Sequence, residues 1–359
     1  MKIRYGMVGG GPGAFIGAVH RMAAALDGEF ELVAGAFDVD PEKSRQQGAE
    51  LGLNPGRVYD TYQEMVAAEA ALPADERIQV VSVVTPNHVH HPVAKAFLQA
   101  GINVVCEKPM TITLEDAEDL CRVVGETGLL FCLTHNYTGY PLVKEARERV
   151  RSGALGEVRK VVVEYSQGWL STLLEAEGQK QAEWRADPAR GGASSVLGDI
   201  GSHAHNLVRY VTGMEVQRLF ADLGTVVPGR KVDDDATVLL ELDGGVRALL
   251  VASQISTGER NHLRLRVYGS EGALDWCQED PNELRLTAPD GTETVLYTGG
   301  TLSERAQAHT RLPGGHPEGF IEAFANLYRN DATRLRAMIK GRKKRKAGHR
   351  VRPLKISCT

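Results

Sequence analysis

The chain has 359 residues, a formal net charge of −4, and 42% hydrophobic and 25% charged residues. This is the ordinary mixture of a globular protein, and the length suffices for two domains with separate cores. No apolar run reaches the roughly 18 residues of a membrane span, and no signal-peptide pattern precedes the first strand pattern. We therefore expect a cytoplasmic protein that needs neither a nucleic acid nor a membrane as partner.

The charge is unevenly distributed, because residues 333–359 are strongly basic and include the block KGRKKRK at 340–346. Such a block is typical of a disordered segment. It is compatible with nucleic-acid binding or nuclear targeting, but we favour an abnormal end, such as one produced by a shifted reading frame. We treat 333–359 as an atypical tail.

The cysteines are odd in number and show no C-x-x-C spacing, and the first three fall in apolar patterns. This indicates reduced, mostly buried thiols and argues against a disulfide framework or a metal site. The cysteines are Cys106, Cys121, Cys132, Cys277 and Cys358.

Residues 3–20, IRYGMVGGGPGAFIGAVH, read as an apolar strand, a glycine cluster and a helix. Backbone N–H groups and the helix dipole converge there, which suits a pyrophosphate. Gly9 and Gly11 supply the turn and the close backbone approach that a dinucleotide requires. The third small residue is either Ala14, at G-x-G-x-x-A spacing, or Gly17, in which case the helix begins nearer Phe15 than Pro12.

A second strand at 30–37 ends on Asp38, whose carboxylate can bind both ribose hydroxyls of an adenosine and repel a 2′-phosphate. This favours NAD, although NADP stays open because Ser44 and Arg45 lie close enough in sequence to bind a phosphate. In the next turn, Asp40 before Pro41 is a helix N-cap pattern.

The third strand, 78–84, is continuously apolar, as expected for a covered parallel strand, and runs into TPNHVH at 85–90. Polar groups at such strand ends line the ligand crevice of an open parallel sheet. We interpret His88, His90 and His91 as hydrogen-bonding residues and not as metal ligands, because no carboxylate stands among them.

The fourth strand, 102–106, leads to Glu107-Lys108-Pro109. Proline holds the preceding lysine extended, so Lys108 points into the same crevice, where it can transfer a proton or polarise a substrate oxygen. A surface ion pair with Glu107 is the alternative. A helix at 113–126 and a strand at 129–134 complete what we predict to be a six-stranded βα array.

After a helix at 140–151 the pattern changes to β-branched segments separated by glycine turns, which indicates a largely antiparallel sheet. The predicted strands lie at 158–165, 216–226, 236–242, 247–253 and 263–268. One helix interrupts them and carries Asp199 and His203, four residues apart on one face, as an acid–base pair. Asp199 is alternatively an N-cap and His205 a solvated residue, while Trp184 and Arg185 can stack on and hydrogen-bond a polyol.

Together these motifs resemble the Gfo/Idh/MocA oxidoreductases, the family of glucose-fructose oxidoreductase and inositol dehydrogenase. The resemblance covers about residues 3–330 and rests on four motifs in order: VGGG with His20, TPN with His90, EKP, and Asp199-x-Gly201-x-His203. It implies an α/β protein with an N-terminal, doubly wound Rossmann domain (1–135) and a C-terminal α/β domain (136–332) whose open, largely antiparallel sheet often forms a homo-oligomer interface, in a dimer or tetramer.

The resemblance further implies NAD(P)-linked oxidation or reduction of a secondary alcohol of a sugar, cyclitol or related polyol, with Lys108, Asp199 and His203 as catalytic residues. The expected cofactor-binding residues are Gly9, Gly11, Ala14, Phe15, Ile16, Asp38, Thr85, Pro86, Asn87, His90, Glu107 and Lys108. The expected substrate-binding residues are Tyr137, Trp184, Arg185 and Asn206. Because Asn136-Tyr137-Thr138-Gly139 replaces a more basic sequence, we expect a neutral substrate; no metal is expected.

Two alternatives stay open at this point. Some chains that resemble this one cleave glycosidic bonds through transient redox chemistry at C3, and a cofactor-sensing binding protein can use the same fold. The first would release free sugar without net NADH, and the second would bind NAD without turnover.

Overall fold

The structure is a computed structural model that describes residues 2–346. These residues divide into two compact units, one comprising 2–134 and 324–346 and the other His135–Ala323. Each unit has its own sheet and its own hydrophobic core. In the described part of the chain, no helix is both long and apolar enough to cross a membrane.

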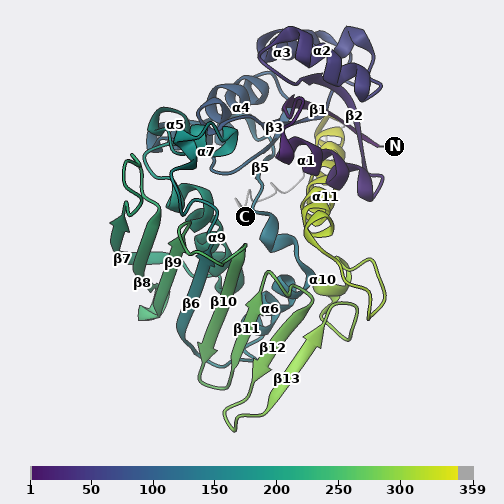
Figure 1. The fold of residues 1–359 in the computed structure, drawn as a ribbon. Helices are drawn as coiled ribbons and strands as arrows, with labels where there is room; N and C mark the ends of the chain where they lie inside the picture. The colour runs from purple at the N-terminus through teal and green to yellow at the C-terminus, as the bar shows by residue number, and fades with distance from the viewer. Residues whose placement is uncertain (1, 347–359) are drawn as a thin grey trace. The chain divides into compact units, whose positions relative to one another are not determined.

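The first unit is built on a parallel sheet with strand order β2-β1-β3-β4-β5. Figure 1 labels β2, β1, β3 and β5 of this sheet. The order reverses between β1 and β3, which places a ligand crevice at the carboxyl ends of these two strands. The strands are β1 (Ile3–Gly9), β2 (Phe30–Ala36), β3 (Val80–Val84), β4 (Asn103–Cys106) and β5 (Phe131–Leu133).

The prediction of six strands is wrong, since this sheet has five within residues 2–346. After β5 the chain enters the second unit through a 3₁₀ turn at Asn136–Gly139 instead of forming another strand.

Helices cover the parallel sheet, and their starts follow the capping patterns of the sequence. The prediction of an Asp40 cap is confirmed, because its carboxylate accepts a hydrogen bond from the Glu42 N–H at 3.0 Å with Pro41 in the first turn. Thr61 and Thr113 cap two further helices in the same way. The helices are α1 (Phe15–Leu26), α2 (Pro41–Glu50), α3 (Tyr62–Ala71), α4 (His90–Gln99) and α5 (Leu114–Thr127).

The second unit contains a sheet with strand order β13-β12-β11-β10-β6-β9-β8-β7. Neighbouring strands are antiparallel except for the parallel pair β6 and β9, which confirms the prediction of a largely antiparallel sheet. The strands are β6 (Val158–Ser166), β7 (Val216–Gly224), β8 (Asp235–Leu242), β9 (Arg247–Ser253), β10 (His262–Gly269), β11 (Ala273–Cys277), β12 (Glu283–Thr287) and β13 (Glu293–Tyr297).

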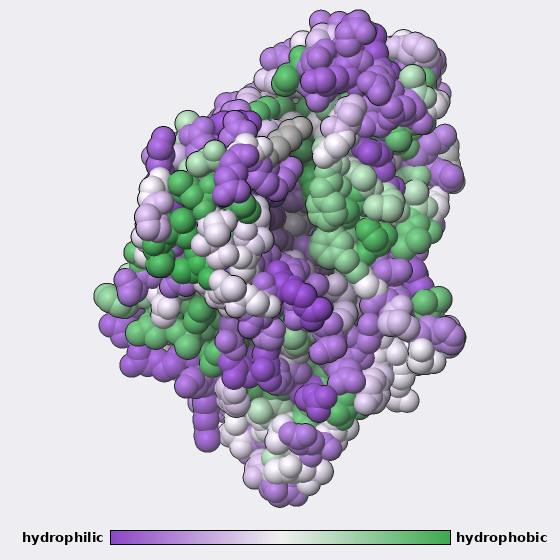
Figure 2. All heavy atoms as spheres, in the orientation of Figure 1, coloured by the Kyte–Doolittle hydropathy of each residue, from purple (hydrophilic) through white to green (hydrophobic). Residues whose placement is uncertain are grey.

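Helices α6 (Pro141–Arg151) and α9 (Ser202–Thr212) pack on each other and against the sheet. Burial alternates along β8, where Leu240 is 5% and Leu239 54% exposed, so the sheet presents an uncovered face. Hydrophobic side chains gather over β7 and β8 (green at the lower left of Figure 2). The shorter helices are α7 (Lys180–Arg185), α8 (Pro188–Gly191) and α10 (Glu304–Gln307).

The last helix, α11 (Phe320–Lys346), begins in the second unit and belongs to the first from Phe324 onward. Its Tyr328 hydroxyl hydrogen-bonds His20 Nδ1 at 2.6 Å and Ser82 Oγ at 2.9 Å. The second unit therefore ends at Ala323 and not at the expected 332, because 324–332 pack on the first unit. Residues 333–346 continue the helix, and the rest of the expected tail lies outside the described residues.

The cysteines differ from expectation at one position. Cys106 and Cys132 are buried and Cys277 is partly buried, but Cys121 is exposed, because it lies on the outward face of α5. Cys358 lies outside the described residues.

Candidate active site

The glycine loop after β1 adopts a backbone that side chains would prevent. Gly9, Gly10 and Gly13 have φ of 85°, 75° and 75°. A Cβ on Gly17 would lie 2.4 Å from the Gly10 Cα, so α1 approaches the loop backbone to backbone. Gly17, and not Ala14, is therefore the third small residue of the glycine motif, the one at which the helix packs closely against the loop.

Ala14 instead precedes α1 as its N-cap residue and donates its N–H to the Gly11 carbonyl at 3.0 Å. The helix begins at Phe15, as one of the two readings of the loop predicts. Phe15 is 70% exposed and Ile16 partly buried in the first turn. Glycines that bring a strand end close to a helix N-terminus fit the pyrophosphate of a dinucleotide, and among residues 2–346 no atom apart from those of Gly13 and its two chain neighbours lies within 4 Å of where a Cβ on Gly13 would stand.

Asp38 lies beside this loop. Its Oδ1 accepts a hydrogen bond from the Asp40 N–H at 3.0 Å, and its Oδ2 is 3.1 Å from where a Cβ on Gly11 would stand. The residues considered for a 2′-phosphate are engaged elsewhere: Ser44 is buried and donates to the Tyr59 carbonyl, while Arg45 pairs with acidic side chains. The arrangement fits an unphosphorylated ribose better than a phosphorylated one.

His90 ties together the segments that follow β3 and β4. Its Nε2 lies 2.9 Å from the Thr85 carbonyl and its Nδ1 2.7 Å from the Pro109 carbonyl. The ring is buried, and burial lowers the pKa of His90 despite these two carbonyls. His90 therefore fixes the shape of the crevice rim on both sides.

The neighbouring histidines point elsewhere. His88 is exposed, and His91 lies 2.8 Å from Asp119 on α5. Residues 2–346 contain no group of three or more His, Cys, Asp or Glu side chains placed to hold a metal ion. Next to them, Pro86 is partly buried and Asn87 buried.

Glu107 is locked in place at the end of β4. One carboxylate oxygen accepts hydrogen bonds from Thr134 Oγ1 at 2.5 Å and pairs with His20 Nε2 at 2.9 Å, and the other accepts the Lys108 N–H at 3.2 Å. Burial acts to raise the pKa of Glu107, but the His20 and Thr134 hydrogen bonds outweigh it and hold that pKa below its usual value. The backbone that carries Lys108 is thus fixed by a buried carboxylate.

In the second unit, Asp199 lies on a π turn (Leu197–Gly201), and His203 lies in the first turn of α9, which continues directly from it. Asp233 caps this segment, accepting hydrogen bonds from Ser194 Oγ at 2.8 Å and the Ser195 N–H at 2.9 Å. The N-cap alternative for Asp199 is wrong, because Asp199 lies inside the π turn, and the carboxylate that accepts backbone N–H bonds at its start is Asp233, from the segment before β8.

His203 is buried among aromatic rings. Its ring centroid lies 4.8 Å from Tyr137, 5.4 Å from His135 and 6.2 Å from Tyr165, in edge-on or tilted geometry. On α9, His203 lies on the buried face of the helix with Ala204 and Leu207. His205 is exposed, as the alternative of a solvated residue predicts. The imidazole therefore packs against three aromatic rings, which restrict its orientation.

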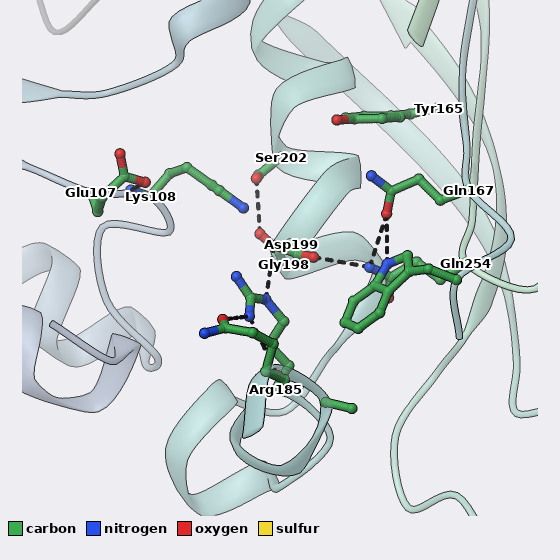
Figure 3. A network of polar contacts seen from close by, with 12 residues as sticks. Glu107, Lys108, Tyr165, Gln167, Arg185, Gly198, Asp199, Ser202 and Gln254 are labelled. Carbon is green, nitrogen blue, oxygen red and sulfur yellow. Dashed lines mark hydrogen bonds and ion pairs between the residues drawn. The ribbon is translucent and has the colours of Figure 1, made fainter. Parts of the chain in front are cut away.

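The Asp199 carboxylate is held by side chains from two other segments (Figure 3). Its Oδ2 accepts a hydrogen bond from Gln254 Nε2 at 2.9 Å, and its Oδ1 lies 3.6 Å from Arg185 Nε. The support of His203 by Asp199 that the four-residue spacing suggests stays a prediction.

Further polar side chains gather where strands of the second sheet meet at one edge. Gln167 and Gln254 directly follow the adjacent parallel strands β6 and β9, and Asn261 directly precedes β10, which is antiparallel to β6. Their amides are connected: Gln167 Nε2 donates to Asn261 Oδ1 at 2.7 Å. None of these three residues is among those predicted from the sequence, although a polar residue at a strand end is the same signal that identified Lys108.

The expected substrate residues are differently placed. The Tyr137 hydroxyl bonds the Tyr165 hydroxyl and accepts the Asn261 amide N–H at 3.2 Å. Trp184 carries the Arg185 guanidinium 4.3 Å over its ring. Asn206 is partly buried on α9, one turn beyond His203. Within the second unit the structure thus brings Tyr137 to His203 and Arg185 to Asp199.

A glycine loop at the carboxyl end of β1 in a doubly wound parallel sheet is the arrangement typical of nucleotide-dependent oxidoreductases. Two family models match the chain: "Oxidoreductase family, NAD-binding Rossmann fold" over residues 3–135 and "GFO/IDH/MocA C-terminal domain" over residues 143–275. The chain belongs to the Gfo/Idh/MocA oxidoreductase family, as its motifs predict, and its first unit is an NAD-binding Rossmann domain.

Relatives and solved structures agree with this assignment. An uncharacterized oxidoreductase of Bacillus subtilis, YfiI, is 34% identical, over 91% of this chain and 84% of that protein. Levoglucosan dehydrogenase of Pseudarthrobacter phenanthrenivorans is 26% identical, over 83% and 80%. The crystal structure of an inositol dehydrogenase homolog from Azotobacter vinelandii with NAD+ has a TM-score of 0.92 at 38% identity, covering 98% of this chain and 90% of that one, and the homolog was also solved with NADH and myo-inositol.

Proposed function

We propose that the chain is an NAD-dependent dehydrogenase that oxidises a secondary alcohol of a neutral sugar, cyclitol or related polyol to a ketone. One observation carries this proposal: an NAD-binding unit is followed in the same chain by a helix that holds a carboxylate, Asp199, and a buried imidazole, His203, on successive turns. Such a pair is suited to remove the hydroxyl proton as hydride leaves the same carbon.

In the proposed reaction, His203 takes the hydroxyl proton as general base, and Asp199 stabilises the imidazolium that results. Lys108 positions the alcohol oxygen and stabilises its developing negative charge. NAD+, when bound, supplies the hydride acceptor. In the reverse direction the same groups protonate a ketone.

The first unit has residues that fit the cofactor. Gly9, Gly11, Ala14, Phe15 and Ile16 would hold the pyrophosphate at the start of α1. Asp38 would bind the adenosine ribose through its hydroxyls. The nicotinamide side would be lined by the residues fixed at the ends of β3 and β4, namely Thr85, Pro86, Asn87, His90, Glu107 and Lys108.

The second unit would supply the substrate contacts. Tyr137, Trp184, Arg185 and Asn206 combine aromatic faces with hydrogen-bonding groups, the combination that binds the apolar face and the hydroxyls of a sugar ring. An inositol dehydrogenase homolog solved with NADH and myo-inositol and a levoglucosan dehydrogenase among the relatives favour this substrate class. Dehydrogenase relatives favour net oxidation over the glycosidase and sensor alternatives.

The uncovered face of the second sheet would form a homo-oligomer interface in a dimer or tetramer. Phe220 on β7 and Leu239, its cross-strand neighbour on β8, are 69% and 54% exposed and lie on the same face of the sheet. Apolar side chains gathered over neighbouring strands mark such interfaces. Sedimentation analysis of the Phe220→Glu variant against the wild type tests this assignment.

The function itself is tested by mixing the purified protein with NAD+ or NADP+ and a panel of inositols, aldoses and glycosides while following the reduced-nicotinamide absorbance. We expect NADH formation with at least one unmodified polyol and a preference for NAD+. Release of free sugar from a glycoside without net NADH would instead identify a glycosidase. Tight NAD+ binding without turnover across the panel would identify a sensor.

A further inference from the structure

Gln254 is the only fully buried amide in the polar cluster at the sheet edge among the described residues, with no exposed surface, and it directly follows β9. Its Nε2 lies between two oxygens, 2.9 Å from Asp199 Oδ2 and 3.5 Å from Gln167 Oε1. Figure 3 shows the side chain reaching from the sheet toward Asp199. Proton transfer through Asp199 and His203 does not by itself explain why an amide is buried there.

The chemistry of the cluster fixes which way this amide faces. The Trp169 indole N–H can only donate, and it does so to Gln167 Oε1 at 2.9 Å, which leaves Gln167 Nε2 to donate to Asn261 Oδ1. Gln167 Oε1 is thus identified as an acceptor, and Asp199 Oδ2 accepts from the same amide, so only the Gln254 NH₂ can face both oxygens.

The same logic orients the hydrogen bonds beside His203. Asn261 Oδ1 accepts from the Tyr165 hydroxyl at 2.8 Å, so the Tyr165 oxygen is the acceptor for the Tyr137 hydroxyl, which in turn accepts the Asn261 N–H at 3.2 Å. Asn261, Tyr165 and Tyr137 thus form a closed cycle of hydrogen bonds, which fixes two of the aromatic rings that pack against His203. Gln167 connects to this cycle by its hydrogen bond to Asn261 Oδ1.

We propose that Gln254 is a positioning residue that fixes the Asp199 carboxylate for its work on His203, with Gln167 and Trp169 holding the Gln254 amide in its donating orientation. A hydrogen bond to an ionised acceptor is stronger than one between neutral groups, and it restricts the carboxylate to one rotamer. This proposal rests on the proposed function, because Asp199 has a role to be positioned for only if it acts with His203.

The test compares the wild type with Gln254→Met, which keeps the side-chain length but removes the donor, and with Gln254→Glu, which places an acceptor against the carboxylate. We expect kcat with the active polyol to fall roughly 10- to 100-fold in both variants while the KM for NAD+ is unchanged, because a misplaced catalytic group costs about this much. In an Asp199→Asn background, Gln254→Met should lower kcat by less than twofold, since the residue that it positions is already disabled.

The matched control is Gln47→Met on α2. Gln47 is also a buried glutamine whose Nε2 approaches a carboxylate, that of Glu50, at 3.4 Å. We expect wild-type kcat in this variant. Equal losses from Gln254→Met in the wild-type and Asp199→Asn backgrounds would overturn the proposal, because they would show a general structural role.

A crystal structure of the Gln254→Met variant gives an answer that does not depend on turnover. We expect the Asp199 carboxylate to leave its wild-type rotamer, and an unmoved carboxylate would overturn the positioning role. Failure of the proposed function would appear elsewhere, as a wild-type protein that forms no NADH with any polyol.

Discussion

The contact between Gly17 and Gly10 makes cofactor binding sensitive to a single methyl group. In the Gly17→Ala variant the new Cβ would lie 2.4 Å from the Gly10 Cα and 3.2 Å from the Gly10 carbonyl carbon and oxygen. Backbone atoms cannot rotate away as a side chain can, so the loop and α1 must separate. Overpacking of this kind costs about 1–3 kcal/mol.

Because the strain falls on the loop that would hold the pyrophosphate, we expect the Kd for NAD+, measured by titration calorimetry, to rise roughly 5- to 150-fold. In Gly13→Ala the new Cβ meets no described neighbour within 4 Å but enters the space that would hold the pyrophosphate and requires a positive φ, so the Kd should rise in this variant too. Gly125→Ala in α5 meets no neighbour within 4 Å in the described part of the chain and should leave the Kd unchanged. Wild-type NAD+ affinity in the Gly17→Ala variant would refute the placement of the cofactor at this loop.

Three other predictions concern catalysis, cofactor choice and stability. His203→Ala and Lys108→Ala should each lower kcat about 10²–10⁴-fold while NAD+ still binds, as steady-state kinetics and calorimetry can show; full turnover would refute their roles. Asp38→Ala should reduce the kcat/KM ratio of NAD+ to NADP+ at least tenfold, and an unchanged ratio would exclude a ribose contact. Burial raises the pKa of Asp331 to about 6, so its charge destabilises the fold increasingly as pH rises through 6 and not at low pH. In urea unfolding, the free energy of unfolding of Asp331→Asn should exceed that of the wild type by about 3 kcal/mol at pH 8 and by less as the pH falls. An equal difference at pH 4 would show that the charge of Asp331 is not responsible.

Most elements of the first unit could be predicted from the sequence because each is encoded by a short run of neighbouring residues. The apolar strands, the glycine loop and the Asp40 cap each depend on a few consecutive residues, and each appears in the structure within one or two residues of its expected place. The short strands β11–β13 were missed because half of their residues face outward and interrupt the apolar pattern, as in β13. The assignment of 324–332 to the first unit was missed because it depends on contacts of Tyr328 with residues some 250–300 positions earlier.

The candidate site shows the same division. Lys108, Asp199 and His203 are recognisable because their residue types and spacing carry chemistry. Gln254 has an ordinary residue type, and only the parallel pairing of β6 with β9 places it beside Gln167 and brings it to Asp199. Likewise, the residue type of Asp199 suggests an N-cap, whereas the carboxylate that accepts the backbone N–H bonds at the start of this segment is Asp233, more than thirty positions away.

The most direct test of the central claim is to follow the transferred hydrogen itself. The protein is incubated with NAD+ and an active polyol that carries deuterium on the carbon to be oxidised, and the nicotinamide product is weighed by mass spectrometry. Direct hydride transfer predicts reduced cofactor that contains one deuterium. Reduced cofactor without deuterium, or none at all from any polyol, would contradict the account.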